Sequence, residues 1–225
     1  KRAIFKSRPN RFIAYCLLDG KQVIAHVRNT GRCREILIPG TTVYLEPSRN
    51  LERKTSYSLV GAEKGETLIN IDSTAPNKIV FEALSNKKLV LPDLDNIFSL
   101  KKEAIYNNSR FDFYIESETS KALVEVKGVT LEENGVAMFP DAPTERGVKH
   151  IEELMKALDE GYLSYMLFII QMKGVKYFRP NFSMHRLFGE TLAKAKEKGV
   201  KILAYDCNVT ADSLEIADLL EVRIK

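Results

Sequence analysis

The chain has few of the residues from which disulfide frameworks and zinc sites are built. Its 225 residues include only three cysteines, Cys16, Cys33 and Cys207. They lie far apart and form no CxxC pair, which favours reduced thiols over disulfides or a zinc site. The three histidines, His26, His150 and His185, are equally scattered. The sequence therefore gives little support for a histidine metal site.

Long hydrophobic runs and glycine-rich phosphate loops are also missing. No apolar run approaches the roughly 20 residues that cross a membrane. The first residues, KRAIFKSRPNRF, have neither a long apolar core nor a small-residue cleavage site. The content of 44% hydrophobic and 28% charged residues is ordinary for a folded protein. We expect no signal peptide, no membrane association, no disulfide partner and a cytoplasmic location.

Charge is divided unequally along the chain. Residues 1–80 contain 14 Lys and Arg against 7 Asp and Glu, a net charge of +7. Residues 81–225 contain 20 against 23, a net charge of −3. This division suggests polyanion binding in the first part and metal binding in the second. The alternative is that surface charge varies along the chain without a function.

The first part of the chain is predicted to form short strands. Phe12–Leu18 and Gln22–Val27 flank Asp19-Gly20-Lys21, a strong hairpin signal. Three more strands are expected, at Thr42–Glu46, Tyr57–Ala62 and Thr67–Ile71. Five short strands indicate a small barrel of the oligonucleotide-binding (OB) type, which we place at residues 1–75.

Basic residues gather at the start of this barrel and in its loops, a placement that suits contacts to phosphate groups. They are Arg8, Arg11, Arg28, Arg32, Arg34, Arg53 and Lys54. Three aromatic residues, Phe12, Tyr15 and Tyr57, could stack on bases. Aromatic side chains in short strands are more often core residues, and we predict a core position for all three.

Residues 76–225 alternate between strand and helix patterns after a boundary at Asp72–Pro76. Their order predicts an α/β mixed sheet with helices on its faces. The expected helices are Asn77–Leu84, a helix whose start is marked by Pro140, Asp141, Pro143 and Thr144 and which Gly161 ends, and Phe182–Lys198. The expected strands are Glu103–Tyr106, Phe111–Ile115, Ala122–Val126, Val136–Phe139, a buried central strand Tyr165–Gln171, and Val200–Tyr205. Leu89–Leu100 is predicted to be a loop.

Carboxylates occur inside two of these apolar strands. Asp112 lies on the first, while Glu125 and Lys127 share one face of the second. Burying them unpaired would be costly, and a divalent cation gives them a reason to be there. Asp112, Glu125 and the Val126 carbonyl could bind Mg²⁺ or Mn²⁺, with Lys127 holding a water or phosphate oxygen. The alternative is an exposed hairpin in which Lys127 and Glu125 neutralise each other.

This Asp…Glu-x-Lys pattern resembles the PD-(D/E)XK nuclease superfamily, although Phe111 stands where a proline often precedes the aspartate. A longer series of motifs resembles the sugar fermentation stimulation protein A family over nearly the whole chain. The series is NTGR (29–32), APNKIVFEAL (75–84), SRFDF (109–113), VEVKGVTL (124–131) and FPDAPTERGVKH (139–150).

The resemblance implies an OB-like N-terminal domain, a nuclease-like C-terminal domain and DNA binding without sequence specificity. It implies catalytic roles for Asp112, Glu125 and Lys127. Further acidic candidates are Glu82, Asp141 and Glu145, of which Glu82 and Asp141 are taken as metal ligands. It also adds Asn29 and Thr30 to the nucleic-acid-binding residues.

Two functions follow as hypotheses. The first is a Mg²⁺- or Mn²⁺-dependent nuclease. The second is a non-catalytic DNA-binding regulator of sugar (maltose) metabolism genes that keeps the nuclease fold. A sugar- or metabolite-binding protein is a third interpretation, but no sugar site is visible in the sequence.

Overall fold

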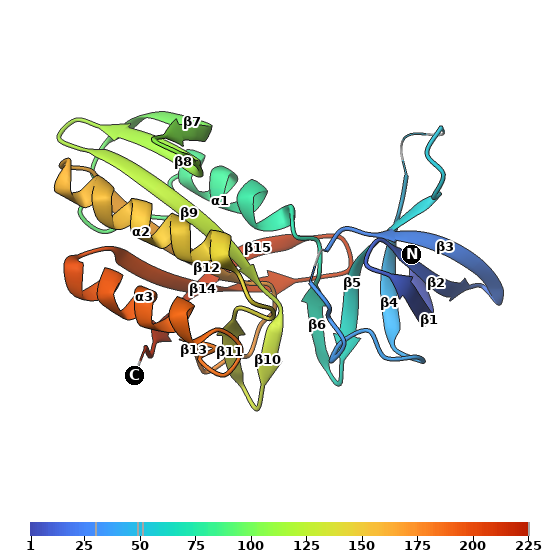
Figure 1. Ribbon diagram of the computed structural model, residues 1–225. Helices are drawn as coiled ribbons and strands as arrows, with labels where there is room; N and C mark the ends of the chain where they lie inside the picture. Colours follow the sequence, from blue (N-terminus) through green and yellow to red (C-terminus); the bar gives the residue numbers. More distant parts are fainter. Residues whose placement is uncertain (30, 49, 51, 225) are drawn as a thin grey trace.

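The described residues, 1–29, 31–48, 50 and 52–224 of a computed structural model, form one sheet of six strands and one of nine. The six-stranded sheet forms a barrel on one side of the molecule, coloured blue to cyan in Figure 1. The nine-stranded sheet and the helices form the other side. The predicted OB barrel followed by a mixed sheet with flanking helices is therefore confirmed.

The barrel closes because its third and fifth strands pair in parallel. Its strands are β1 (Arg2–Asn10), β2 (Ile13–Leu18), β3 (Lys21–Val27), β4 (Thr42–Pro47) and β5 (Tyr57–Lys64), with β6 (Thr67–Asn70) added to β5 as a hairpin. Asp19 and Gly20 both adopt positive φ in the β2–β3 turn. This conformation matches the twist of a tight hairpin, and Asp-Gly favours it.

The second domain is built on a mixed sheet in the order β10-β11-β13-β15-β14-β12-β9-β8-β7. Its strands are β7 (Ile97–Tyr106), β8 (Ser109–Ser117), β9 (Lys121–Val129), β10 (Leu131–Glu133), β11 (Val136–Phe139), β12 (Leu163–Ile170), β13 (Tyr177–Pro180), β14 (Lys201–Val209) and β15 (Leu214–Val222). The helices are α1 (Ala75–Ser85), α2 (Glu145–Asp159) and α3 (Arg186–Lys198).

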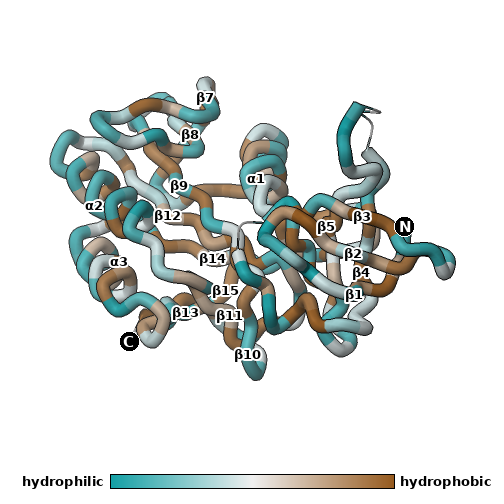
Figure 2. The backbone as a smooth tube through the Cα atoms, turned by 45° about the vertical axis from the view of Figure 1, so that its right-hand side comes forward, coloured by the Kyte–Doolittle hydropathy of each residue, from teal (hydrophilic) through white to brown (hydrophobic). Residues whose placement is uncertain are grey.

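The central strand β12 separates two apolar layers. Met166 and Phe168 pack in one cluster with residues of α2 and α3. Tyr165 and Leu167 point the other way, into a cluster that contains the apolar stripe of α1. Successive strand residues face opposite sides, so a strand buried on both faces is apolar throughout. Figure 2 shows this as brown colour along β12 and β14.

Several boundaries differ from the sequence predictions. The predicted loop at 89–100 was too long, because β7 begins at Ile97 and pairs with β8 along its whole length. As the last strand of the sheet, β7 leaves Phe98 and Ile105 exposed, so it lacks the pattern of a half-buried strand. Strands β1, β10, β13 and β15 were not predicted. The buried central strand was predicted correctly, and of the residues that marked the start of α2, Thr144 is the one that caps the helix.

The two domains are joined through the segment that follows β6. The Gln171 side chain, just after β12, donates to the carbonyl oxygens of Asn70 and Asp72, each at 3.0 Å. In return the Asn70 amide donates to the Gln171 carbonyl at 2.9 Å. An ion pair of 2.7 Å links Lys64 of β5 with Glu132 of β10.

No helix among the described residues is long and apolar enough to span a membrane.

Candidate functional site

The site is built where β8 and β9 separate. Their antiparallel ladder pairs Glu116 with Lys121 and ends at the Phe113–Val124 pair. One residue further, the Asp112 carboxylate takes the place of a ladder partner. Its Oδ2 accepts from the Val126 amide at 2.7 Å, and its Oδ1 accepts from the side chain of Asn77, on α1, at 2.6 Å. Asp112 is therefore fixed by both the second strand and the first helix.

Glu125 lies on the neighbouring strand and is only 3% exposed. Its Oε1 accepts from Lys127 Nζ and contacts His150 Nδ1 at 2.5 Å. His150 comes from α2, and its other nitrogen, Nε2, accepts from Arg146 Nε at 3.3 Å. A neutral imidazole that carries its proton on Nδ1 satisfies both contacts. Glu125 Oε2 is buried and has no hydrogen-bond partner among the described residues.

Burial and neighbouring groups shift the pKa of both carboxylates, in opposite directions. Burial, followed by the nearby charge of Glu125, raises the pKa of Asp112 above its ordinary value, against the opposing effects of the Val126 amide and Lys127. Burial also acts to raise the pKa of Glu125, but the hydrogen bond from His150 and the charge of Lys127 outweigh it and leave that pKa lowered. Two acidic groups that repel each other in a buried place are typical of a functional site.

Asp112, Glu125 and Lys127 line a cavity of about 420 Å³ between the two domains. Asp141, at the segment before α2, lines the same cavity, as do Arg146 and Gln171. The barrel contributes Asn29 and Gly31, from the loop after β3. Gly31 lies against Asp141 so closely that a Cβ at position 31 would overlap the Asp141 carboxylate. The cavity therefore belongs to both domains.

Three of the acidic candidates occupy different surroundings. Asp141 lies in the cavity, as described, whereas Glu82 is exposed on α1 and lines two other cavities. Asn77, rather than Glu82, is the α1 residue that reaches Asp112. Glu145 is exposed and lies 3.3 Å from His185 in an ion-pair geometry. The structure therefore does not bring Glu82 or Glu145 into this site. In the described residues no three His, Cys, Asp or Glu side chains converge as a preformed metal site.

Arg8 is committed to the barrel itself. Its guanidinium donates to four backbone carbonyls, those of Gly31 at 3.0 Å, Arg32 at 2.8 Å, Arg11 at 2.6 Å and Asn29 at 2.8 Å. The prediction that Arg8 binds phosphate is therefore not supported by the geometry. Arg8 instead holds the backbone of Asn29, Gly31 and Arg32 against the barrel.

Asn29 has a similar structural position. Its side chain donates to the Ile71 carbonyl at 2.9 Å and accepts from the Gly31 amide at 2.7 Å. Both ends of the Asn29 amide are thus used inside the protein, although the residue lines the cavity. Thr30, the other residue assigned from the NTGR motif, lies outside the described residues.

Replacing Arg8 by Ala is expected to lower the free energy of unfolding by about 3 kcal/mol, because hydrogen bonds from a charged group each contribute about 1.5–3 kcal/mol and do not add fully. Urea-induced unfolding measures the change. Arg34→Ala is the matched control, since exposed Arg34 should change stability by no more than ~0.5 kcal/mol. Equal stabilities of the two variants would show that the Arg8 contacts do not hold the loop.

The remaining basic candidates divide into two groups. Arg11, Arg32 and Arg34 line a groove of about 590 Å³ on the barrel, together with Arg8, and their side chains are exposed. None of these three forms an ion pair with a described residue. Arg53 and Lys54 lie apart from that groove, between β4 and β5, and Arg53 donates to the Ser58 hydroxyl at 3.0 Å.

Of the three aromatic residues predicted to be core, Phe12 is not. Its side chain is 45% exposed, and the Arg11 guanidinium lies 4.8 Å from its ring centre. Tyr15 is half-buried, and Tyr57 is half-buried against the barrel core. Phe12 lies at the turn between β1 and β2, where the strand pattern no longer buries alternate side chains.

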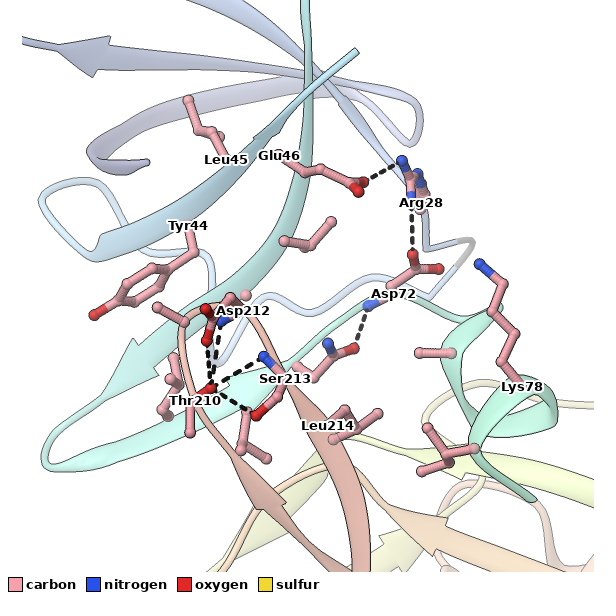
Figure 3. A pocket seen from close by; sticks show the side chains of 18 of the residues that line it. Arg28, Tyr44, Leu45, Glu46, Asp72, Lys78, Thr210, Asp212, Ser213 and Leu214 are labelled. Atoms are coloured by element: carbon pink, nitrogen blue, oxygen red, sulfur yellow. Dashed lines mark hydrogen bonds and ion pairs between the residues drawn. The ribbon is translucent and has the colours of Figure 1, made fainter. Parts of the chain in front are cut away.

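A second cavity, of about 450 Å³, also lies between the two domains. Figure 3 shows Arg28 between two carboxylates, with Glu46 at 2.5 Å and Asp72 at 2.9 Å. The sequence places Arg28 among the basic residues of the barrel, but these ion pairs neutralise it. Its position stabilises the connection between barrel and sheet.

Four residues of the site were not predicted from the sequence: Asn77, His150, Arg146 and Gln171. Arg146 and His150 are four residues apart on α2 and so share one helix face. That spacing was a usable signal once α2 had been predicted. Asn77 and Gln171 gave no signal, because a single amide at an element end has no distinctive pattern.

An OB barrel joined to a mixed α/β sheet, with two buried carboxylates and a lysine where two strands separate, defines a two-domain class of protein. Two family profiles match this chain. The "SfsA N-terminal OB domain" matches residues 7–71, and the "Sugar fermentation stimulation protein RE domain" matches residues 74–213. The chain therefore belongs to the sugar fermentation stimulation protein (SfsA) family, as its motifs indicated.

Relatives match over nearly the whole chain. A sugar fermentation stimulation protein homolog of Desulfitobacterium hafniense is 56% identical over 220 residues, covering 98% of this chain and 94% of that protein. The homolog of Clostridium beijerinckii is 52% identical over 218 residues, covering 97% and 95%. A solved structure of Pyrococcus furiosus SfsA in complex with Ca²⁺ is 33% identical, with a TM-score of 0.88 and coverage of 99% and 95%.

Proposed function

We propose that this protein cleaves phosphodiester bonds of nucleic acid in a divalent-metal-dependent reaction of the PD-(D/E)XK type. The observation that carries the proposal is Glu125 Oε2, which is buried without a partner among the described residues, in a side chain that lines the same cavity as Asp112 and Lys127. A buried carboxylate oxygen without a partner is costly, and a bound cation would remove that cost.

The donor set fits Mg²⁺ or Mn²⁺. These hard cations prefer oxygen ligands and bind through one or two carboxylates while keeping several waters. Asp112 and Glu125 would hold the cation, and Val126, with its backbone carbonyl, and Asp141 line the same cavity. The Pyrococcus furiosus relative was solved as a complex with Ca²⁺, another oxygen-preferring cation.

The chain's own residues divide the chemical work. A bound cation would supply a Lewis acid and offset charge on the phosphate. Asn77 and the Val126 amide hold Asp112 in one orientation, and His150 does the same for Glu125. Lys127 Nζ, which already donates to Glu125, has two further protons with which to orient an attacking water or to bind a phosphate oxygen. Such fixed donors act most strongly where charge develops in the transition state.

The barrel would supply nucleic-acid binding without sequence specificity. Arg11, Arg32 and Arg34 have exposed guanidinium groups without acidic partners among the described residues, which suits contacts to phosphates of any sequence. DNA is the substrate that the family resemblance implies. The groove and the acidic cavity would place binding and cleavage on different domains.

The test is metal binding and cleavage by the purified chain and two isosteric variants. Asp112→Asn and Glu125→Gln are expected to weaken Mn²⁺ binding at least ~10-fold in calorimetric titration, since each removes a charged ligand. Glu82→Gln is the matched control, because Glu82 is an exposed carboxylate outside the cavity. Unchanged Mn²⁺ affinity in both variants would assign the two carboxylates a structural role only.

The cleavage assay uses labelled DNA and RNA with Mg²⁺, with Mn²⁺ and with EDTA. Products that appear only with a divalent cation, and not with Asp112→Asn, are the expected result. A protein that binds DNA but cuts neither polymer would refute catalysis. That result would leave the alternative of a non-catalytic DNA-binding regulator.

A further inference from the structure

We propose that the arginine groove of the barrel and the acidic cavity form one path for a single nucleic-acid strand, so that the preferred substrate is single-stranded. This inference rests on the function proposed above and specifies its substrate class. Gly31 lines both hollows, and it is the residue at which they meet. A strand bound along Arg11, Arg32 and Arg34 would therefore pass over Gly31 toward Asp112 and Glu125.

The absence of a side chain at Gly31 makes the junction compact, with side chains of both domains close to it. Gly31 has no side chain, and a Cβ there would overlap the side chains of Asp141 and Asn29. Arg8 and Asn29 fix the surrounding backbone through their hydrogen bonds to it. The Gly31 backbone and the side chains of Asp141 and Asn29 that lie against it separate the groove from the cavity at this point. Asp141 also lies at the junction, where its negative charge would repel a phosphate. A bound cation would be needed there to offset that charge.

The dimensions of the cavity favour a single strand. A volume of about 420 Å³ is the size of a site for a small molecule, and here it has walls from both domains. Glu125 is almost completely buried at its lining. To reach the buried carboxylates, duplex DNA would have to bring its second strand along with the first. That second strand lies across a minor groove about 6 Å wide or a major groove about 12 Å wide. We therefore expect one strand, rather than two, to enter between the barrel loop and the sheet.

The groove also has the chemistry that single strands use. Proteins that bind single strands combine a basic groove with aromatic side chains on which bases stack. Phe12 is exposed beside Arg11, with the guanidinium over the ring. The ring and the guanidinium together offer an unpaired base a stacking surface beside Arg11, which lines the groove.

Binding is tested on the full chain with Ca²⁺ present and with EDTA, by fluorescence anisotropy. The probes are labelled oligothymidine of about 12 nucleotides and its blunt duplex with oligodeoxyadenosine, a length within the range that one OB fold covers. We expect the single strand to bind at least ~10-fold more tightly than the duplex, and equal affinities would contradict the path. An oligouridine of equal length shows whether RNA takes the same path.

Two double variants locate the path. Arg32→Ala with Arg34→Ala should weaken single-strand binding about 10-fold and reduce its salt slope by about 1.4, at roughly 0.7 per phosphate contact. Lys194→Ala with Lys196→Ala removes the same charge from α3 and should change neither quantity. Equal losses in both double variants would overturn the path, because binding would then depend on net charge alone.

Cleavage separates this inference from the proposed function. With Mn²⁺, a duplex with a single-stranded thymidine tail should be cut in the tail while the blunt duplex stays intact. Cutting of blunt duplex and single strand at equal rates would overturn the single-strand path and leave the nuclease standing. No cutting together with preferred single-strand binding through Arg32 and Arg34 would uphold the path and refute the nuclease. Absence of nucleic-acid binding would refute both.

Discussion

Replacing Lys127 by Ala is expected to reduce nucleic-acid cleavage at least ~10²-fold, the loss seen when one electrostatic stabiliser is removed from an active site. Lys127 lines the cavity and donates to Glu125, so its ammonium group lies beside the carboxylate proposed to bind metal. Its proposed role is realised mainly in the transition state. The rate should therefore fall much more than the affinity for substrate.

Cleavage rate and binding affinity are measured on the same protein. Lys121→Ala is the matched control, because Lys121 lies on the same strand, β9, but is exposed and pairs with Glu116 at the far end of the β8 ladder. Should Lys127→Ala lower affinity and the salt slope by about one unit while the rate at saturation stays constant, Lys127 is a phosphate contact and has no catalytic role.

The parts of the site that could be predicted from sequence are those encoded locally. Asp112 and Glu125 interrupt two apolar strands that are close in sequence, so a hairpin and its alternation place them on neighbouring strands. Lys127 follows from the same two-residue period. The central strand β12 was recognisable for a related reason, since only a strand buried on both faces is apolar at every position.

The parts that could not be predicted depend on contacts between distant residues. His150 is 25 residues from its partner Glu125, and the loop at Gly31 meets Asp141 from another domain. Nothing in the local pattern of either segment specifies such a contact. Strand β15 was missed for a similar reason, because it has no fully buried position and its residues LEIADLLEV show no clear alternation.

Arg8 illustrates the limit of reading charge alone. The sequence shows a basic residue in a basic segment, and a solvent-exposed role on phosphate is the natural inference. Whether the guanidinium meets phosphate or backbone carbonyls depends on the path of a loop more than twenty residues away. Arg11, a near neighbour in the sequence, keeps its exposed position, so two arginines of one groove have different surroundings.

His150 should have the second large effect, as a positioning residue that acts through Glu125. When a residue that hydrogen-bonds to a metal ligand is removed, metal affinity or activity typically falls 10- to 100-fold. His150→Leu removes the donor at 2.5 Å from Glu125 Oε1 while keeping an apolar side chain in the buried position beside Phe111. We expect Mn²⁺ affinity and cleavage rate to fall by roughly 10- to 100-fold, since Glu125 loses its orientation.

The conservative variant His150→Asn separates positioning from packing. The Asn side-chain amide can occupy the place of Nδ1 and donate to Glu125, although it fills less space than the ring. Recovery of Mn²⁺ affinity in His150→Asn, with His150→Leu still impaired, is the expected result in calorimetric titration. If both variants lose stability by the same amount in urea and both bind Mn²⁺ as the parent does, His150 contributes only to the core between β8 and α2, and Glu125 is oriented by Lys127 alone.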